Sequence, residues 1–195
     1  MRLVFGSYNA HKLAEVRAML PPRVIVWGLA SLDNIEEVPE TGNTLVENAL
    51  LKARGYAQRT GQACFADDTG LEIAALQGKP GVYSARYAAQ ATAEANIQKV
   101  LSEMAEITER NAQFRTVIAF CHPKDTREFW VSGALTGTIT SEPRGHFGFG
   151  YDPIFQPTNL SQTLAELTPE QKNTLSHRKK AIRSFIKQLS KYYVL

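Results

Sequence analysis

Cysteine is scarce in this sequence, and long apolar runs are missing. Two cysteines occur among 195 residues, Cys64 and Cys121, and neither belongs to a Cys/His pattern with metal-ligand spacing. We therefore expect both to be reduced residues of the core. No apolar stretch approaches the roughly 20 residues of a membrane-spanning helix, and His11 and Lys12 come before any signal-peptide core. The sequence predicts no membrane partner and a cytoplasmic location.

An excess of charge of either sign is also missing. Lys and Arg total 22 against 19 for Asp and Glu, which gives a formal net charge of +3. This weak excess comes without a zinc, RRM or helix-turn-helix pattern, so we expect no nucleic-acid partner. Hydrophobic residues make up 44% of the chain, which excludes a disordered protein. The length predicts a single domain over residues 1–195.

Hydrophobic patterning predicts strands that alternate with helices. Apolar runs predict strands over residues 2–5, 23–29, 113–121 and 128–139. Amphipathic periodicity predicts helices over residues 11–20, 44–60, 93–107 and 169–193. A capping box of Thr44 and Glu47 begins the clearest helix, and Thr168 with Pro169 begins the last. This alternation favours an α/β fold with a mixed sheet.

Two adjacent carboxylates interrupt an apolar segment. In QACFADDTGLEIAAL the apolar run ends at Asp67 and Asp68 and resumes after Gly70, which predicts a strand, an acidic turn and a second strand or short helix. Neighbouring carboxylates repel, and such a pair is typical of a metal site or a general base. Alternatively, Asp67 caps the turn and Asp68 is solvated. Glu40 could be a second ligand of the same ion or part of an exposed acidic loop.

The segment SYNAHK, residues 7–12, lies between the first expected strand and helix. Amides at a helix N-terminus and the helix dipole attract anions, and Lys12 adds a positive charge. The same residues fit an ordinary strand-to-helix turn with a solvated lysine. Lys52, on the third turn of its helix, would likewise be solvated in the ordinary case. A phosphate site is thus one of two interpretations.

A glycine-rich loop, GHFGFGYDPIF, follows the last expected strand. Its glycines run in the order GxxGxG, the reverse of the dinucleotide fingerprint, so we exclude a Rossmann site. Phe147, Phe149 and Tyr151 could stack a base, or could lie in the core of a hairpin loop. His177 and Arg178 could bond a 6-oxo group on a purine, or could belong to a solvated basic helix.

Six blocks occur in order over nearly the whole chain: SYNAHK, ETGNTLVENALLKA, FADDTGLEI, GKPGVYSARY, GFGYDPIF and AELTPEQKNTLSHR. Together they resemble the inosine/xanthosine triphosphate pyrophosphatases, which hydrolyse non-standard purine nucleoside triphosphates to the monophosphate and pyrophosphate. The resemblance implies dITP, ITP and XTP as substrates, whose removal prevents their incorporation into DNA and RNA. It also implies an elongated mixed β-sheet flanked by helices, two lobes around a central active-site cleft, Mg²⁺ as cofactor, and a homodimer.

The resemblance assigns roles to the residues that match the motifs. It implies that Asp68 is the acid-base residue and that Glu40 and Asp68 bind Mg²⁺. The substrate-binding residues that it implies are Ser7, Tyr8, Asn9, Ala10, His11, Lys12, Lys52, Thr69, Phe149, Gly150, Tyr151, Asp152, Lys172, His177 and Arg178. Tyr8 stands where the family commonly has Gly, and a tyrosine would be strained there if the position needs a positive φ. Phe147 replaces a frequent Gly and adds bulk beside the base.

Two other functions fit part of the sequence. A pyrophosphatase for pyrimidine or modified nucleotides would share the chemistry, and a nucleotide-sensing module would bind the triphosphate without hydrolysing it. The carboxylates of Asp67, Asp68 and Glu40 disfavour a simple sensor, because carboxylates near an anionic ligand require a metal. The DxD spacing of haloacid-dehalogenase-type phosphatases is absent from the sequence.

Overall fold

The structure is a computed structural model that describes residues 1–32 and 34–194. Asp33, which falls in the expected acidic loop, and Leu195 lie outside the described residues. The strands are β1 (Arg2–Phe5), β2 (Ile25–Gly28), β3 (Cys64–Ile73), β4 (Asn111–Cys121), β5 (Glu128–Ile139) and β6 (Phe155–Pro157). The α-helices are α1 (Ala10–Met19), α2 (Leu45–Thr60), α3 (Ala93–Glu103), α4 (Pro169–Leu175) and α5 (His177–Leu189). No helix in these ranges is long and apolar enough to cross a membrane.

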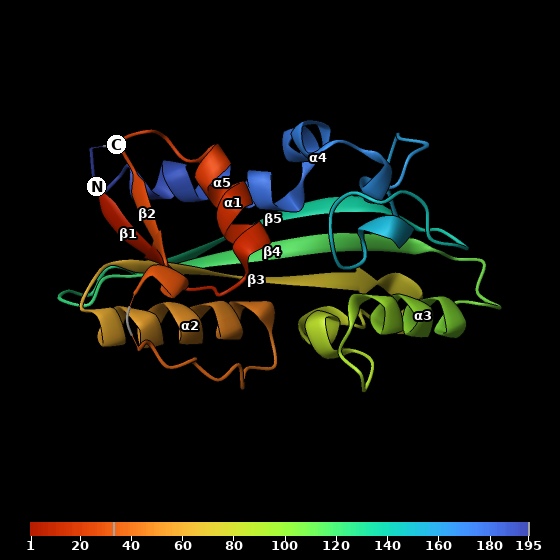
Figure 1. Cartoon of the computed structure of the whole chain (residues 1–195), viewed down its shortest axis with the longest axis horizontal. Coiled ribbons are helices and arrows are strands. Elements are labelled where there is room, and N and C mark those ends of the chain that lie inside the picture. The colour runs from red at the N-terminus through yellow and green to blue at the C-terminus, as the bar shows by residue number, and fades with distance from the viewer. Residues whose placement is uncertain (33, 195) are drawn as a thin grey trace. The chain divides into compact units, whose positions relative to one another are not determined.

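The strands form one mixed sheet in the order β2-β1-β3-β4-β5-β6 (Figure 1). β1 pairs in parallel with β2 on one side and with β3 on the other, whereas β6 pairs antiparallel with β5. The strand order therefore reverses beside β1. In α/β proteins, ligands bind at the carboxyl ends of the strands at such a reversal. The predicted α/β fold with a mixed sheet is confirmed.

Two compact units divide the chain, and β3, β4 and β5 each contribute residues to both. The first unit comprises Met1–Asp68, Thr116–Gly133 and Arg178–Leu195. The second comprises Thr69–Arg115 and Ala134–His177. Each unit has hydrophobic core residues of its own, so each is described separately below.

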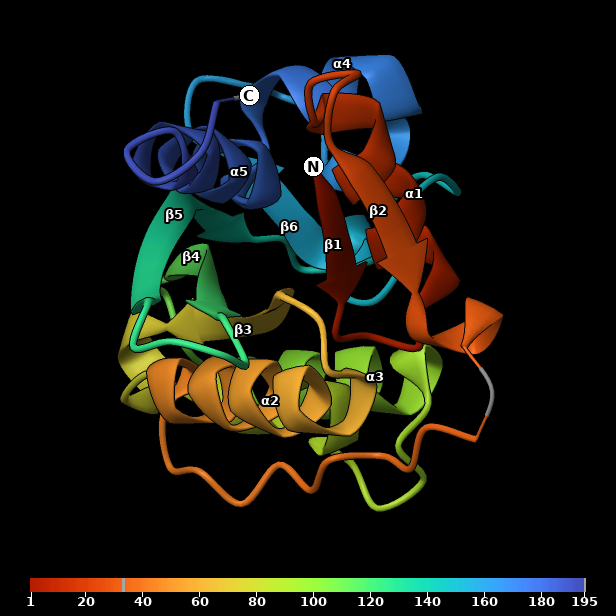
Figure 2. The ribbon, with the colours of Figure 1, turned by 90° about the vertical axis from the view of Figure 1, so that its left-hand side faces the viewer.

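In the first unit, successive residues of β1 and β3 face two different cores. Leu3, Phe5 and Phe65 belong to a core that includes residues of α1 and α5. Val4 and Cys64 belong to a core that includes residues of α2. Figure 2 shows α1 and α5 on one side of these strands and α2 on the other. The twofold period of a strand therefore directs Phe65 of β3 toward α1 and α5, and its neighbour Cys64 toward α2.

Helix α2 forms as its sequence predicts. The Thr44 hydroxyl accepts from the Glu47 N–H at 3.1 Å, and the Glu47 carboxylate accepts from the Thr44 N–H at 3.2 Å. Gly61 ends the helix in the left-handed region, at φ +63°. The buried face of α2 carries Asn48 and Lys52 among its apolar residues. Buried polar groups require partners, so this face positions part of a site.

The core of the second unit packs α3 against the adjoining parts of β3, β4, β5 and β6. The rings of Phe114 on β4 and Phe155 on β6 lie 4.7 Å apart between centroids. Thr92 caps α3 by accepting the N–H of Ala95 at 3.1 Å. The helix expected over 93–107 ends earlier, at Glu103.

The expectation of an acidic turn at residues 67–68 is wrong. β3 runs unbroken from Cys64 to Ile73, with both carboxylates inside the strand and buried. A buried carboxylate is tolerated where a cation compensates its charge, and both have such partners, as described below. The single terminal helix is also wrong, because Ser176 interrupts it with an extended backbone, φ −61° and ψ 150°.

The two cysteines are free thiols among the described residues, as expected. Cys64 is buried, and burial raises the pKa of its thiol. Cys121 is half-buried and packs against the core on the α2 side, at its margin rather than inside it. Its position explains this, since it is the last residue of β4 before the loop of residues 122–127.

The aromatic contact between α5 and the sheet gives a stability prediction. The Phe185 ring is fully buried and stacks on Phe65 with centroids 4.9 Å apart. Phe185→Ala should lower the free energy of unfolding by about 3–5 kcal/mol, because it removes buried area and leaves a cavity. Urea unfolding followed by circular dichroism measures this. The control Lys187→Ala, on the exposed face of α5, should change it by less than about 0.5 kcal/mol.

Candidate functional site

The loop between β1 and α1 is ordered by its own side chains. The Ser7 hydroxyl accepts the N–H of Asn9 at 3.2 Å, and Asn9 Oδ1 accepts the N–H of Lys12 at 3.1 Å. Asn9 is thus the N-cap of α1. Ala10 and His11 form the exposed first turn, where helix N–H groups lack intrahelical partners. This end of α1 has the amides and the dipole that attract an anion.

The strain expected at Tyr8 does not occur. Positive φ among the described non-glycine residues is confined to Asn34, Gln77, Ala91 and Asn159. Tyr8 therefore has an ordinary backbone conformation, and its side chain is 45% exposed. A tyrosine is accommodated in this loop without a glycine-specific conformation.

Asp67 is the centre of a buried ion-pair network. Lys12 Nζ of α1 donates to Asp67 Oδ1 at 3.1 Å. Arg178 of α5 donates from Nε and a terminal nitrogen to Asp67 Oδ2, each at 3.3 Å, and its other terminal nitrogen donates to Glu15. One carboxylate thus bonds two cations from two helices on the same side of the sheet. The network fixes where the Lys12 ammonium lies.

The charges in this network determine its protonation. Burial alone would raise the pKa of Asp67, but Lys12 and Arg178 hold that pKa well below its ordinary value. Burial lowers the pKa of Lys12, and Asp67 partly opposes the shift. Asp67 is therefore ionised at neutral pH and balances the buried Arg178 and the half-buried Lys12.

Asp68 belongs to a second cluster, on the α2 side. Lys52 Nζ lies 3.4 Å from Asp68 Oδ1 and 2.5 Å from Glu40 Oε1. Asn48, one turn before Lys52, donates from Nδ2 to Asp68 Oδ2 at 3.3 Å, and its Oδ1 accepts the Gly42 N–H at 2.8 Å. The two carboxylates predicted to share a cation thus meet at one ammonium.

The second cluster raises the pKa of both its acid and its base. Burial raises the pKa of Asp68, Lys52 opposes the shift, and Glu40 adds to it. Burial alone would lower the pKa of Lys52, but Asp68 and Glu40 raise it above its ordinary value. Asp68 is therefore a better proton acceptor than an ordinary aspartate.

The geometry of β3 explains how adjacent carboxylates serve two clusters. Asp67 shares the odd-numbered face of Phe65, toward α1 and α5, and Asp68 shares the even-numbered face of Cys64, toward α2. β1 pairs only as far as Phe65, so both aspartates lie beyond its carboxyl end. Lys52 is close enough to lower the pKa of Lys12, and Asp67 is close enough to both lysines to raise the pKa of each. The clusters are neighbours at the strand-order reversal.

In the second unit, Asp152 joins Lys172 to the glycine-rich loop. Lys172 Nζ donates to Asp152 Oδ2 at 2.7 Å, and the Phe149 N–H donates to the same oxygen at 2.8 Å. The Lys172 ammonium lies 4.6 Å from the centre of the Phe149 ring. Gly148 has φ +77°, and a Cβ there would lie 2.2 Å from Asp152 Oδ2, so glycine is required.

The other candidate residues of the second unit differ in exposure. The His177 ring is buried and lies 4.9 Å from the Phe114 ring. Tyr151 is also buried, and its hydroxyl donates to the Ser84 carbonyl at 2.9 Å. Thr69 and Gly150 are half-buried. Phe147 is exposed, so the loop aromatics are neither all in the core nor all on the surface.

Two network residues, Glu15 and Asn48, are not identified by the sequence patterns. Asp67 is identified there as part of a metal site or general base, or as a turn cap, but its role at the centre of an ion-pair network is not predicted. The alternation of apolar residues through CFADDTGLEI could have identified a continuous strand with Asp67 on a buried face. Asn48 stands four residues before Lys52, which places two polar groups on one buried helix face. Glu15 has no comparable signal, because its partner Arg178 is 163 positions away.

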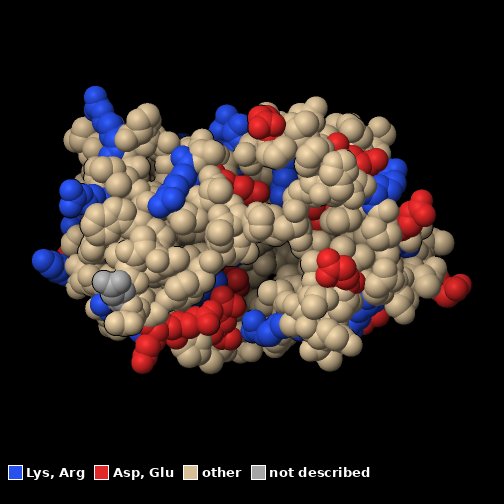
Figure 3. Space-filling view, viewed as in Figure 1, with Lys and Arg blue, Asp and Glu red and all other residues tan. Residues whose placement is uncertain are grey.

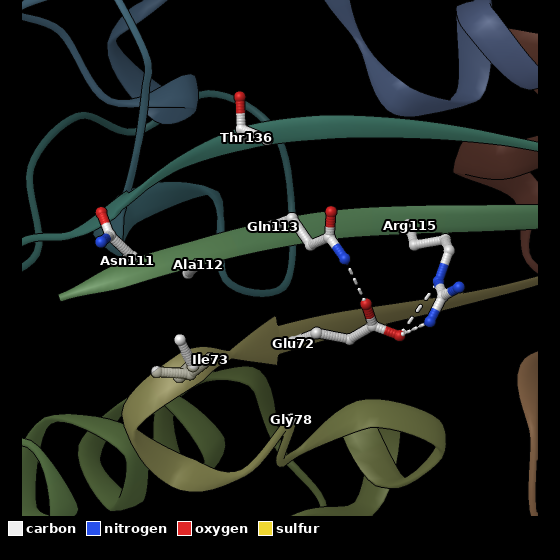
Figure 4. A pocket seen from close by; sticks show the side chains of 9 residues that line it. Glu72, Ile73, Gly78, Asn111, Ala112, Gln113, Arg115 and Thr136 are labelled. Carbon is white, nitrogen blue, oxygen red and sulfur yellow. Dashed lines mark hydrogen bonds and ion pairs between the residues drawn. The ribbon is translucent and has the colours of Figure 1, made fainter.

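A pocket of about 430 Å³ lies elsewhere on the second unit, over β3, β4 and β5 (Figure 4). Glu72 points toward two side chains of β4: Gln113 donates to Oε2 at 2.7 Å, and Arg115 donates to Oε1 from Nε at 3.0 Å. None of the candidate residues is among the described residues that line it. This pocket is separate from the candidate site.

The surface charge is mixed. On the face seen in Figure 3, Lys and Arg side chains are interspersed with Asp and Glu.

Within residues 1–32 and 34–194, no group of three or more His, Cys, Asp and Glu side chains is arranged to hold a metal. Glu40 and Asp68 are a pair, which matches Mg²⁺, an ion often bound by one or two carboxylates together with substrate phosphates.

The fold and these clusters define a class of protein. A helix N-terminus, two lysines and a carboxylate pair meet at the strand-order reversal of an α/β sheet. Such an arrangement suits a phosphate-bearing ligand together with a divalent cation.

Comparison with known proteins agrees with this class. Residues 3–188 match the model of the Ham1 family, and the chain belongs to that family. It is 45% identical over 191 residues to a dITP/XTP pyrophosphatase of Flavobacterium johnsoniae, covering 97% of this chain and 98% of the relative. It is 44% identical over 190 residues to a dITP/XTP pyrophosphatase of Bacillus subtilis, covering 95% and 96%.

Solved structures show the same fold. The Ham1 protein of Staphylococcus aureus superposes with a TM-score of 0.89 at 39% identity, covering 99% of this chain and 100% of that one. A structure titled nucleoside-triphosphatase / dITP/XTP pyrophosphatase, from Mycobacterium abscessus, has a TM-score of 0.79 at 41% identity, covering 95% and 99%. The suspected family is therefore confirmed.

The Asp67 network gives a stability prediction. Asp67→Asn should lower the free energy of unfolding by about 3–5 kcal/mol, because the buried Arg178 and the half-buried Lys12 lose the anion that they share. Urea unfolding at neutral pH measures the change. Glu128→Gln, which breaks the surface pair with Arg54, is the control and should cost less than about 1 kcal/mol. Equal effects of the two variants would contradict a central role for Asp67.

Proposed function

We propose that this chain is a nucleoside triphosphate pyrophosphatase that hydrolyses dITP, ITP and XTP to the monophosphate and pyrophosphate. The observation that carries the proposal is the meeting of Asp68, Glu40 and Lys52 beside Lys12, beyond the carboxyl end of β1. The names of the curated relatives support the substrate class. Removal of these nucleotides would prevent their incorporation into DNA and RNA.

The donors in the first unit fit Mg²⁺ as the cofactor. Glu40 and Asp68 offer hard carboxylate oxygens, and both already approach one positive charge, the Lys52 ammonium. When bound, Mg²⁺ would neutralise charge on the phosphate oxygens. The two carboxylates would hold the ion, with the substrate phosphates supplying further oxygens.

Lys12, Lys52 and the first turn of α1 would bind the triphosphate. Phosphoryl transfer demands positioning and charge neutralisation more than covalent help from the protein. The Asp67 network holds the Lys12 ammonium, and Asp68 and Glu40 hold that of Lys52. Ser7, Tyr8, Asn9, Ala10 and His11 would contribute the phosphate-binding loop. Arg178 is bonded to Asp67 and Glu15 within this unit.

Asp68 would act as the general base. A water oxygen attacks the α-phosphorus, the bond to the β-phosphate oxygen breaks with pyrophosphate leaving, and the water proton passes to the Asp68 carboxylate. The raised pKa of Asp68, caused by its burial, improves it as an acceptor. The amide of Asn48 keeps the Asp68 carboxylate oriented.

Residues of the second unit would recognise the base. Phe149 would stack on it, with Thr69, Gly150, Tyr151, Asp152 and Lys172 completing the substrate contacts. His177, together with Arg178 from the first unit, would bond the 6-oxo edge. A site built for N1–H and O6 leaves buried groups unpaired when adenine binds, because adenine has the opposite polarity.

The remaining expectations from the family resemblance belong to this proposal. The two units would act as one domain around a central active-site cleft, the chain would form a homodimer, and it would work in the cytoplasm without a nucleic-acid or membrane partner. Size measurement in solution would test the homodimer directly.

A substrate panel tests the proposed function. Pyrophosphate release from dITP, ITP, XTP, dTTP and ATP is measured with Mg²⁺ and with EDTA. We expect rapid Mg²⁺-dependent release from dITP, ITP and XTP, and release from ATP slower by at least about 10²-fold, because the unpaired polar groups penalise adenine. Equal rates with ATP would contradict the base recognition. Preference for dTTP would favour a pyrimidine enzyme, and binding without release would favour a sensor.

Asp68→Asn tests the general base. The variant keeps the shape of the side chain but cannot accept the proton, so kcat for ITP should fall by about 10²- to 10⁴-fold. The dissociation constant of ITP, measured with Ca²⁺ in place of Mg²⁺, should change far less. Asp125→Asn, the same substitution in the loop after β4, is the matched control. Near-normal turnover of Asp68→Asn would refute this role.

A further inference from the structure

The segment of residues 34–42 that carries Glu40, here called the acidic loop, contains no helix or strand. It is tied to the first unit by hydrogen bonds instead. From α2, the Tyr56 hydroxyl accepts the Val38 N–H at 3.2 Å, and Arg59 donates to the Glu36 carbonyl at 2.6 Å. Asn48 accepts the Gly42 N–H, and Lys52 bonds Glu40 itself. The position of Glu40 therefore depends on these hydrogen bonds, here called tethers.

Tyr8 makes a further hydrogen bond to the acidic loop, and this one comes from the loop after β1 rather than from α2. Its hydroxyl donates to the carbonyl of Ile35, so the loop after β1 reaches the acidic loop directly. The Tyr8 ring lies edge-on to the Tyr56 ring, with centroids 6.5 Å apart and an angle of 77°. Both tyrosines thus bond the backbone of the acidic loop while contacting each other.

The position of Tyr8 in the chain gives this contact a functional consequence. Tyr8 directly precedes Asn9, the N-cap of α1, at the proposed phosphate-binding turn. Glu40, five residues after Ile35, meets Lys52 and Asp68 at the proposed cation site. A glycine, which the related family commonly has at this position, has no side chain that could make this connection.

We propose that Tyr8 is a positioning residue that couples the phosphate-binding turn to the acidic loop and thereby holds Glu40 at the Mg²⁺ site. The role of Glu40 in this inference rests on the proposed function, whereas the hydrogen bond between Tyr8 and Ile35 is independent of it. Loss of the hydroxyl loosens the acidic loop and weakens Mg²⁺ binding more than it slows the chemistry, because Asp68 and Lys52 are held by β3 and α2.

Hydrogen exchange tests the tether independently of catalysis. In Tyr8→Phe, without nucleotide or Mg²⁺, amides of residues 34–42 should exchange about 3- to 10-fold faster, the factor expected for one net hydrogen bond. Tyr192→Phe is the matched control, since Tyr8 and Tyr192 are both 45% exposed. Unchanged exchange in Tyr8→Phe would overturn the inference even if the chain proves to be a pyrophosphatase.

Mg²⁺ titration tests the coupling to Glu40. The Mg²⁺ concentration for half-maximal pyrophosphate release from ITP should rise about 3- to 10-fold in Tyr8→Phe, with a smaller change in kcat. Calorimetric titration of the protein with Mg²⁺ and the α,β-imido analogue of ITP, whose nitrogen bridge replaces the oxygen of the bond that would be cleaved, should show the same loss of affinity. Faster exchange with unchanged Mg²⁺ affinity would refute the coupling. If the wild type releases no pyrophosphate, the proposed function fails while the exchange result still decides the tether.

Discussion

The buried charge of Asp67 is the interaction on which the candidate site depends. It compensates Lys12 from α1 and Arg178 from α5, two helices that are far apart in the sequence but lie on the same side of the sheet. Without this anion, the buried Arg178 would keep its ion pair with Glu15 but lose the one with Asp67, and the half-buried Lys12 would lose its counter-charge. Because it sits inside β3, the carboxylate ties both helices to the sheet and leaves the Lys12 ammonium at the carboxyl end of β1.

Much of this fold follows from sequence patterns, because the patterns reflect local physics. The Thr44 and Glu47 capping box, the strands of residues 111–121 and 128–139, and the α/β class all depend on short-range periodicity or capping. The expectation failed at residues 67–68, where charge suggested a turn. Ion pairs with residues distant in sequence keep the strand intact, and no local pattern contains them.

The candidate site was likewise predicted only in part. Glu40, Lys52 and Asp68, identified through family resemblance, do meet in the structure. The pairing of Asp67 and Glu15 with Arg178 was not predicted, because Arg178 lies more than 100 residues later in the chain. The condition under which Tyr8 would be strained, a positive φ, is not met, because the loop takes an ordinary conformation there.

The site combines residues held by a strand and a helix with one residue, Glu40, held by separate hydrogen bonds. The two kinds of residue differ in how far the loss of one hydrogen bond displaces them. Asp68 and Lys52 come from a strand and a capped helix, so their relation survives the loss of any single hydrogen bond. Glu40 comes from an irregular segment whose place is set by several separate bonds. Under the proposed function, changes in those bonds would alter how well Glu40 holds a cation, whereas Asp68, the proposed proton acceptor, would stay in place. Tyr8, proposed above as one of these tethers, would therefore adjust metal affinity without moving the proposed catalytic group.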